Sequence, residues 1–188
     1  MKAVLMSIKP EWCELIASGK KTFELRKSFP RLENLSVPFK VYIYETQSYS
    51  AVPQVYEDGT MIFKGRGKVI GEFVCKEIDR ISKRGINNNF DYCYLSLNEF
   101  GNDDIEVEIR DIKKSCISKK ELNSYGANSP ELFAWHISDL VIYDQPKELA
   151  EFHAPCDSKC DGMCYEGVGC CRVITRPPQS WCYVEELE

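Results

Sequence analysis

The clearest chemistry in this 188-residue chain lies in one short run, Gly19-Lys20-Lys21-Thr22-Phe23-Glu24-Leu25-Arg26. From Thr22 the run alternates polar and apolar side chains, which predicts a strand. Such a strand turns Phe23 and Leu25 toward a core. It presents Glu24 and Arg26 together on the other face, either as a solvated ion pair or as the lining of a pocket. In a pocket the carboxylate lowers the cost of burying the guanidinium, and both groups can hydrogen-bond a polar ligand.

Three further residues extend this candidate ligand site. Lys21 adds a flexible cation, which we expect at the rim, and Thr22 supplies a hydroxyl on the face of Glu24. Lys9 lies just before the helix that is predicted to begin at Pro10. It either joins the site or is a plain surface lysine. The predicted ligand-binding residues are therefore Lys21, Glu24, Arg26, Lys9 and Thr22.

If the protein is an enzyme, the same residues must also take part in catalysis. Lys21 and Glu24 would then be catalytic: burial near Arg26 would lower the pKa of Lys21, and Glu24 would act as a general base on water. His136 is a further acid or base candidate, although a lone histidine in an apolar strand is more often a core residue.

The surrounding elements must position this run. Residues 3–8 predict a buried strand, and Pro10 and Gly19 suit the first position and the end of a short helix. Ser118 and Glu121 form a capping-box pattern that opens a second helix, ended by Gly126. Further strands are predicted at 39–46, 67–76, 105–110, 133–144 and 181–185, and a loop or irregular hairpin at 47–65. This set predicts an α+β fold, a small, mostly antiparallel β-barrel with two or three short helices packed on it.

Composition narrows the class of protein. The chain is 44% hydrophobic and 28% charged, which suits one globular domain, with or without a small appendage. No stretch approaches the roughly 20 apolar residues of a membrane span, and the first ten residues lack the apolar core of a signal peptide. We therefore expect a cytoplasmic protein. A net charge of −5 argues against a broad, non-specific nucleic-acid coat.

Cysteine crowds the C-terminal part of the chain. A reducing cytosol argues against a disulfide framework, and four thiolates, or three with one imidazole, make a closed zinc site. Free or redox-active thiols and an iron–sulfur cluster are the alternatives. Zinc binding would supply folding free energy to a segment that has few apolar side chains of its own. Four of six residues would hold it: Cys156, Cys160, Cys164, Cys170, Cys171 and His153.

The pattern G-x-K-x-x-E-x-R at 19–26, its place after a first strand and short helix, and the tail Arg176-Pro-Pro-Gln-Ser-Trp-Cys-Tyr-Val resemble the ASCH domain family. The stretch Trp135-His-Ile-Ser-Asp-Leu140 resembles the late strand of phage- and prophage-borne members. The resemblance covers residues 1–150 and 174–186. It implies a PUA-like β-barrel whose motif, here Lys21, Glu24 and Arg26, lines a cleft beside the barrel.

The same resemblance suggests how the chain is divided. Residues 1–150 would form the ASCH-like barrel domain. Residues 151–173 would form the Cys-rich insert, and residues 174–188 would return a final strand to the barrel.

The resemblance implies two kinds of function. PUA-like barrels commonly bind RNA, so we expect RNA or a modified nucleotide in the cleft, with Trp12 or Trp181 either stacking on a base or packing in the core. The alternative is a hydrolase acting on an acylated nucleoside or on RNA. Some small family members are nucleoside amidohydrolases in which the motif lysine acts with a threonine three residues later, and ribonuclease activity has been linked to others. Lys21 matches that lysine, but Glu24 stands at the threonine position.

Overall fold

The structure is a computed structural model, which describes residues 1–31, 35–55, 61–86, 89–94, 112–156 and 172–187. Within these ranges the helices are α1 (Pro10–Ala17) and α2 (Lys119–Gly126), with 3-10 turns at Ile112–Ser115 and Leu149–Glu151. The strands are β1 (Lys2–Ile8), β2 (Phe23–Arg26), β3 (Phe39–Glu45), β4 (Tyr49–Val55), β5 (Met61–Lys64), β6 (Val69–Cys75), β7 (Ile78–Ile86), β8 (Asn89–Tyr94), β9 (Glu131–His136), β10 (Ser138–Lys147) and β11 (Trp181–Glu185).

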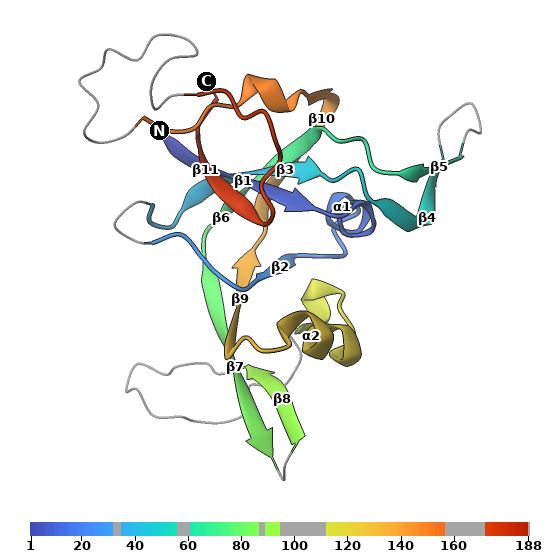
Figure 1. Cartoon of the computed structure of the whole chain (residues 1–188), viewed down its shortest axis with the longest axis vertical. Coiled ribbons are helices and arrows are strands. Elements are labelled where there is room, and N and C mark those ends of the chain that lie inside the picture. The colour runs from blue at the N-terminus through green and yellow to red at the C-terminus, as the bar shows by residue number, and fades with distance from the viewer. Residues whose placement is uncertain (32–34, 56–60, 87–88, 95–111, 157–171, 188) are drawn as a thin grey trace.

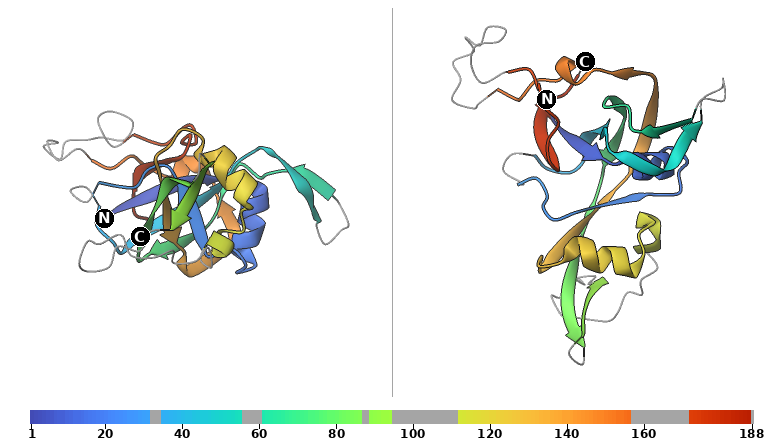
Figure 2. Two further views of the ribbon diagram at one scale, coloured as in Figure 1. Left: turned by 90° about the horizontal axis from the view of Figure 1, so that it is seen from below. Right: turned by 45° about the vertical axis from the view of Figure 1, so that its right-hand side comes forward.

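The strands pair into two larger sheets and one hairpin (Figure 1). The five-stranded sheet has the order β10-β6-β3-β1-β11, and the four-stranded sheet has the order β2-β9-β7-β8. The hairpin β4-β5 projects to one side (Figure 2). All pairs are antiparallel except β1 with β3. The predicted mixed α+β class, mostly antiparallel with a few short helices, is confirmed.

Two long segments connect the sheets. β6 continues almost directly into β7, and β9 continues into β10. β6 pairs with β10 in the first sheet, and β7 pairs with β9 in the second. Because the same two segments take part in both sheets, the short site strand β2, which pairs with β9, is tied to the five-stranded sheet. Figure 1 shows this as one long ribbon running down from β6 to β7.

Three hydrophobic clusters hold these layers together. The first lies between the five-stranded sheet and α1, and it includes the fully buried Trp135 of β9. The second lies under β2, β9 and α2 and contains Phe23 and Leu25. The third covers the other face of the five-stranded sheet, where Phe152 packs on the Tyr42 ring at 4.8 Å between centroids. The core-facing prediction for Phe23 and Leu25 is therefore confirmed.

Local sequence signals set the elements that carry the site. Pro10 occupies the first turn of α1, and Gly19, just after the helix, has a φ of +71°, which glycine adopts without strain. This turn leads the chain from α1 into β2. The capping box at Ser118 and Glu121 is present at the start of α2. The predicted strand at 105–110 lies outside the described residues, and sequence reasoning missed β7 and β8.

No helix in the described part of the chain is long and apolar enough to cross a membrane.

Candidate functional site

The three charged residues of the motif meet in one buried cluster, here called the charged triad (Lys21, Glu24 and Arg26). Lys21 Nζ lies 3.2 Å from Glu24 Oε2, and Arg26 Nη2 lies 2.9 Å from Glu24 Oε1. The residues are only 4%, 6% and 8% exposed, in chain order. The alternation of polar and apolar residues left two interpretations of Glu24 and Arg26, a solvated ion pair or the lining of a pocket. Their burial excludes the solvated pair. Lys21 also differs from expectation, because it is buried rather than free at a rim.

Backbone carbonyls complete the binding of both cations. Lys21 Nζ donates a 2.6 Å hydrogen bond to the carbonyl of Ser115, just before α2. Arg26 Nη2 donates a 2.8 Å hydrogen bond to the carbonyl of Ser7, near the end of β1. Two cations and one carboxylate leave a formal charge of +1, and carbonyl dipoles offset only part of it. The triad is therefore a buried site with excess positive charge.

The C-terminal tail closes over the Arg26 side of the triad. Ser7 N donates to the Ser180 carbonyl at 3.0 Å, and Ser7 Oγ donates to the Pro178 carbonyl at 2.6 Å. Arg26 Nη1 lies 3.5 Å from Ser180 Oγ, at the limit of a hydrogen bond. The motif and the Arg-Pro-Pro-Gln-Ser-Trp tail, which are more than 150 residues apart, therefore form one structural unit.

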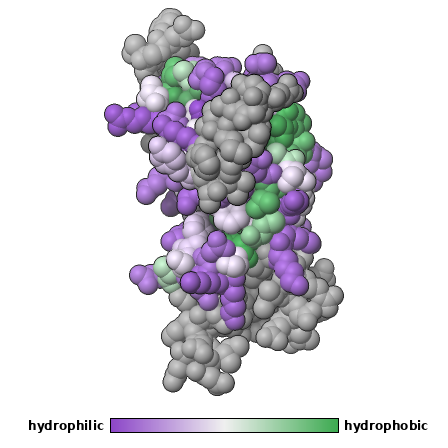
Figure 3. Space-filling view, turned by 90° about the vertical axis from the view of Figure 1, so that its right-hand side faces the viewer, coloured by the Kyte–Doolittle hydropathy of each residue, from purple (hydrophilic) through white to green (hydrophobic). Residues whose placement is uncertain are grey.

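A small cavity of about 60 Å³ opens beside Lys21 and Glu24. Its other lining residues are Trp12, Leu25, Ile117 and Tyr125. Lys21 Nζ lies 5.1 Å from the Trp12 ring centroid, within cation–π range. Figure 3 looks onto the side of α1 and α2, where hydrophobic surface lies directly beside hydrophilic surface.

The pKa of Tyr125 depends in part on the charges of the triad. Loss of solvent around the phenol raises the pKa of Tyr125, with Arg26 lowering it and Glu24 raising it. The phenol is therefore neutral at pH 7 and can both donate and accept a hydrogen bond at the cavity.

Two polar atoms of the triad have unused hydrogen-bonding capacity. Among the described residues, Arg26 Nε is buried without a hydrogen-bond partner, and Glu24 Oε2 is buried with an ion pair to Lys21 but without an accepted hydrogen bond. Buried polar groups in proteins are nearly always satisfied, so unsatisfied ones mark places that a water, an ion or a ligand can fill.

The described residues that line the triad cavity do not include the other two predicted ligand-binding residues, Lys9 and Thr22. Lys9 is exposed, and its carbonyl accepts the first hydrogen bonds of α1 from Trp12 and Cys13. Thr22 is partly buried, and its N–H donates to the Lys114 carbonyl. The triad side chains instead contact the backbone carbonyls of Ser7 and Ser115 and the hydroxyl of Ser180.

Both candidate stacking tryptophans are partly buried. Trp12 packs beside Lys21, and Trp181 lies 5.8 Å from the Trp135 ring centroid. Trp181 also donates its indole N–H to Ser28 Oγ at 3.1 Å. Trp181 is thus held by the fold, whereas Trp12 borders the cavity.

His136 lies on the other face of the four-stranded sheet, away from the triad. Its Nε2 is 2.6 Å from Asp79 Oδ2, its Nδ1 is 3.8 Å from Glu77 Oε2, and its ring packs on Phe23. One ligand atom from each of these three polar residues lies within 4.8 Å of the others, so the group could coordinate a divalent cation. A direct His–Asp hydrogen bond already accounts for the contact.

The Cys-rich segment is described only at its two ends. His153 forms an antiparallel bridge with Val173, and Ala154 N donates to the Arg172 carbonyl at 2.9 Å. Cys156 is partly buried, while Cys160, Cys164, Cys170 and Cys171 lie outside the described residues. The ends of the segment are thus held together by backbone hydrogen bonds.

Sequence reasoning missed Ser7, Ser115 and Tyr125. A serine between Met6 and Ile8 in an otherwise apolar strand was a usable signal, because a buried hydroxyl needs a partner. Ser115 contributes only its backbone carbonyl, which every residue has, so its role could not be read from residue type.

Comparison with solved structures identifies the fold. The chain is similar to an ASCH protein from Zymomonas mobilis, with 17% identity and a TM-score of 0.55 over 98% of this chain and 88% of that one. Two mutant forms of the same protein match equally well, with TM-scores of 0.55 and 0.54, identities of 17% and 16%, and coverages of 99% and 98% of this chain against 92% and 89% of theirs. No protein-family model and no curated protein matches the chain. The ASCH-type fold expected from the motif is therefore shown.

Proposed function

We propose that this chain is an ASCH domain protein that binds RNA or a modified nucleotide, with the charged triad holding a phosphate. The fold similarity and the G-x-K-x-x-E-x-R motif support the family assignment. The observation that carries the function is the triad itself, which has a buried formal charge of +1 and whose Lys21 and Glu24 line a cavity.

A phosphate oxygen suits this site better than a neutral ligand does. Charge-assisted hydrogen bonds from Lys or Arg to a phosphate are about twice as strong as neutral ones. A cavity of about 60 Å³ has room for such an oxygen or for one or two waters, since water occupies about 30 Å³ in the liquid.

Hydrolysis has less support among the described residues. Ser7 Oγ already donates to the Pro178 carbonyl. Burial raises the pKa of the Cys13 thiol well above its usual range, with Glu45 and Glu24 adding to the effect, so the reactive thiolate is disfavoured. Binding without turnover is therefore the function that we propose.

Lys21→Met tests the triad. It keeps the length of the side chain and leaves Glu24 and Arg26 as a neutral pair, so the fold should survive. We expect affinity for a short single-stranded RNA to fall about tenfold or more, and the slope of log affinity against log salt to shrink by about one. Calorimetry at several salt concentrations measures both, and mass spectrometry of the same samples, run with plain and acylated nucleosides, detects any product.

The matched control for this test is Lys68→Met. Lys68 pairs with Glu148 at 2.7 Å on the surface, away from the triad, and its side chain is 42% exposed. RNA affinity and salt slope that are equal in Lys21→Met and the parent protein would contradict the phosphate assignment. A product that disappears in Lys21→Met would replace binding by hydrolysis as the function.

We also propose that zinc holds the Cys-rich segment through four of the six predicted ligands. The bridge between His153 and Val173 supports this, because it brings the two ends of the segment together. Native mass spectrometry should find one zinc per chain, lost on chelation. Cys160→Ser and Cys164→Ser should each lower zinc occupancy, whereas Cys182→Ser, a change in β11, should leave it unchanged. Metal-free protein after purification with zinc would count against the site.

A further inference from the structure

A second group of polar side chains lies where the chain passes from one sheet to the other. Glu77 belongs to the short link between β6 and β7, and Asp79 lies at the start of β7. His136 ends β9, just before the link to β10. The side chains of His136 and Asp79 are 25% and 24% exposed, and that of Glu77 is 65% exposed.

Backbone pairing brings these three residues together. His136 N donates a 3.0 Å hydrogen bond to the Glu77 carbonyl, which also accepts from the Cys75 thiol at 3.3 Å. The register of β7 with β9 sets Asp79 opposite Ala134, two residues from His136. Opposed residues and their diagonal neighbours project from the same face of a sheet. Glu77 and Asp79 are therefore both within reach of the imidazole.

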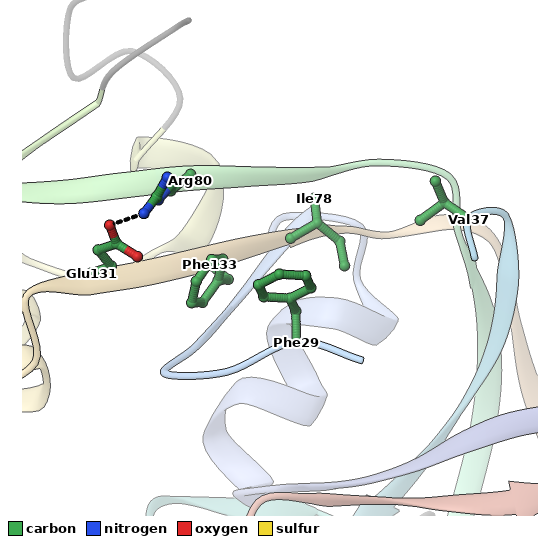
Figure 4. A pocket seen from close by; sticks show the side chains of 6 residues that line it. All are labelled: Phe29, Val37, Ile78, Arg80, Glu131 and Phe133. Atoms are coloured by element: carbon green, nitrogen blue, oxygen red, sulfur yellow. Dashed lines mark hydrogen bonds and ion pairs between the residues drawn. The ribbon is translucent and has the colours of Figure 1, made fainter. Parts of the chain in front are cut away.

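The surroundings of His136 are apolar on one side. Phe23 of β2 lies opposite His136, and the two rings are 4.2 Å apart between centroids. Phe23 is only 5% exposed, so it shields that side of the imidazole from water. The opposite face of β7 and β9 carries a separate pocket of about 390 Å³, shown in Figure 4 and lined by Phe29, Val37, Ile78, Arg80, Glu131 and Phe133.

Each ring nitrogen of His136 faces a different carboxylate. Nε2 lies 2.6 Å from Asp79 Oδ2, and Nδ1 lies 3.8 Å from Glu77 Oε2. An ionised carboxylate can only accept a hydrogen bond, so in the neutral imidazole Nε2 carries the proton and Nδ1 keeps its lone pair. A separation of 3.8 Å is too long for a direct hydrogen bond between Nδ1 and Glu77. Two electron-pair donors therefore face one space between them.

This spacing suits a metal ion. Imidazole nitrogens and carboxylate oxygens bind zinc at about 2.0–2.2 Å, so two such ligands of one ion lie roughly 3.0–4.3 Å apart, depending on the angle at the metal. The distance of 3.8 Å from Nδ1 to Glu77 falls in this range. Asp79 has the second role that metal sites need, because a metal-binding histidine nearly always donates its other ring N–H to a carboxylate, a backbone carbonyl or water.

The local charge also favours a divalent cation. Glu77 and Asp79 together with a neutral imidazole carry a formal charge of −2. The adjacent Lys76 pairs with Asp139 at 2.8 Å, so this pair adds no net charge. Imidazole suits zinc and other transition metals, whereas Ca²⁺ and Mg²⁺ prefer oxygen ligands alone.

We propose that His136 Nδ1 and the Glu77 carboxylate bind a divalent transition-metal ion, with Asp79 orienting the imidazole and water completing the coordination. The ion would link the β6–β7 connection to the end of β9, where the chain crosses between the sheets. This site is independent of the charged triad and of the Cys-rich segment. A proton on Nδ1, donated toward Glu77, is the competing occupant of the same space.

Mn²⁺ is the probe for this site, because it is paramagnetic and broadens nearby NMR resonances, and because thiolates are poor ligands for it. In titrations of the full chain with MnCl₂, resonances of His136, Glu77 and Phe23 should broaden first, and excess zinc, which binds such ligands more tightly, should restore them. Glu77→Gln should abolish this local broadening. Asp79→Asn should weaken Mn²⁺ binding about tenfold, the lower part of the range for loss of an orienting carboxylate.

The matched control is Glu148→Gln, which changes an exposed carboxylate that pairs with Lys68. It should leave Mn²⁺ binding unchanged. Stability gives a second readout, since Mn²⁺ at ten times its Kd should raise the Tm of the parent protein by roughly 3–5 °C. Glu77 is mostly exposed, so Glu77→Gln should fold and melt like the metal-free parent, without a rise in Tm on adding Mn²⁺.

Three results would overturn parts of this proposal. Mn²⁺ affinity that is equal in Glu77→Gln and the parent protein, or resonances of His136 that do not respond to Mn²⁺, would exclude the site. Unchanged affinity in Asp79→Asn would exclude the orienting role of Asp79. Nitrogen-15 NMR that finds protons on both ring nitrogens of His136 in the presence of Mn²⁺ would replace the metal with a proton.

Discussion

Glu24→Gln should destabilise the protein more than any other change in the triad. The substitution removes the carboxylate of the triad and leaves Lys21 and Arg26 as two buried cations without the counter-charge that Glu24 supplies. Breaking a buried ion pair in this way typically costs about 3–5 kcal/mol. For a chain of this length that corresponds to a fall in Tm of roughly 6–20 °C, measurable by calorimetry or by circular dichroism.

The controls for this prediction come from the triad itself. Lys21→Met and Arg26→Met each leave one cation paired with Glu24, so both should cost less than Glu24→Gln. A Tm for Glu24→Gln equal to that of Lys21→Met would mean that solvent or an ion already neutralises the site. The order of the three variants therefore reports the net charge of the cluster directly.

Trp135→Ala should have the second large effect. Trp135 is fully buried and lies opposite Glu24 of β2 and Ile78 of β7. Its ring makes an edge contact with Phe39 at 5.6 Å and a tilted contact with Trp181 at 5.8 Å. Removing a buried tryptophan side chain costs about 3–5 kcal/mol, because it leaves a cavity that the core cannot fully close. Urea unfolding monitored by far-UV circular dichroism measures the loss.

Trp12→Ala is the control for this second prediction. Trp12 is only partly buried and contacts Lys21 at the cavity, so its loss should cost clearly less stability. Equal losses for the two tryptophans would show that α1, not β9, holds the centre of the core. Reduced RNA affinity in Trp12→Ala, with little change in stability, would place the ligand at the triad cavity.

Under the proposed function, the triad has both a structural and a binding role. The hydrogen bonds of Lys21 and Arg26 join β2 and the turn before it to β1, to the residues before α2 and to the C-terminal tail. The proposed ligand would use the formal positive charge and the Arg26 Nε, which has no hydrogen-bond partner among the described residues. A charge placed in a rigid, partly dry setting interacts more strongly with a phosphate than the same charge on a solvated surface. In this proposal, burial of the triad's charges both lowers the stability of the protein and strengthens its binding of a phosphate.

Local sequence signals were enough for the elements around the site. The alternation of Phe23 and Leu25 with polar residues indicated β2, and Pro10, Gly19 and the Ser118–Glu121 capping box marked the helices. These signals work because turns, caps and strand faces depend on residues close together in the chain. The pairing of Glu24 with Arg26 on one face could likewise be predicted from their spacing.

Only the tertiary structure decided whether those charges are solvated or buried. Burial of the triad depends on the Ser115 and Ser7 carbonyls and on the tail at Ser180, which are remote in sequence and in part invisible to residue type. A pocket of about 390 Å³ over β7 and β9 likewise combines Arg80 and Phe133, which strand register sets opposite each other, with Phe29 from the segment after β2. The sequence by itself determined the charged motif and its strand, because both are local. Packing between distant segments determined that the charges of the motif are buried.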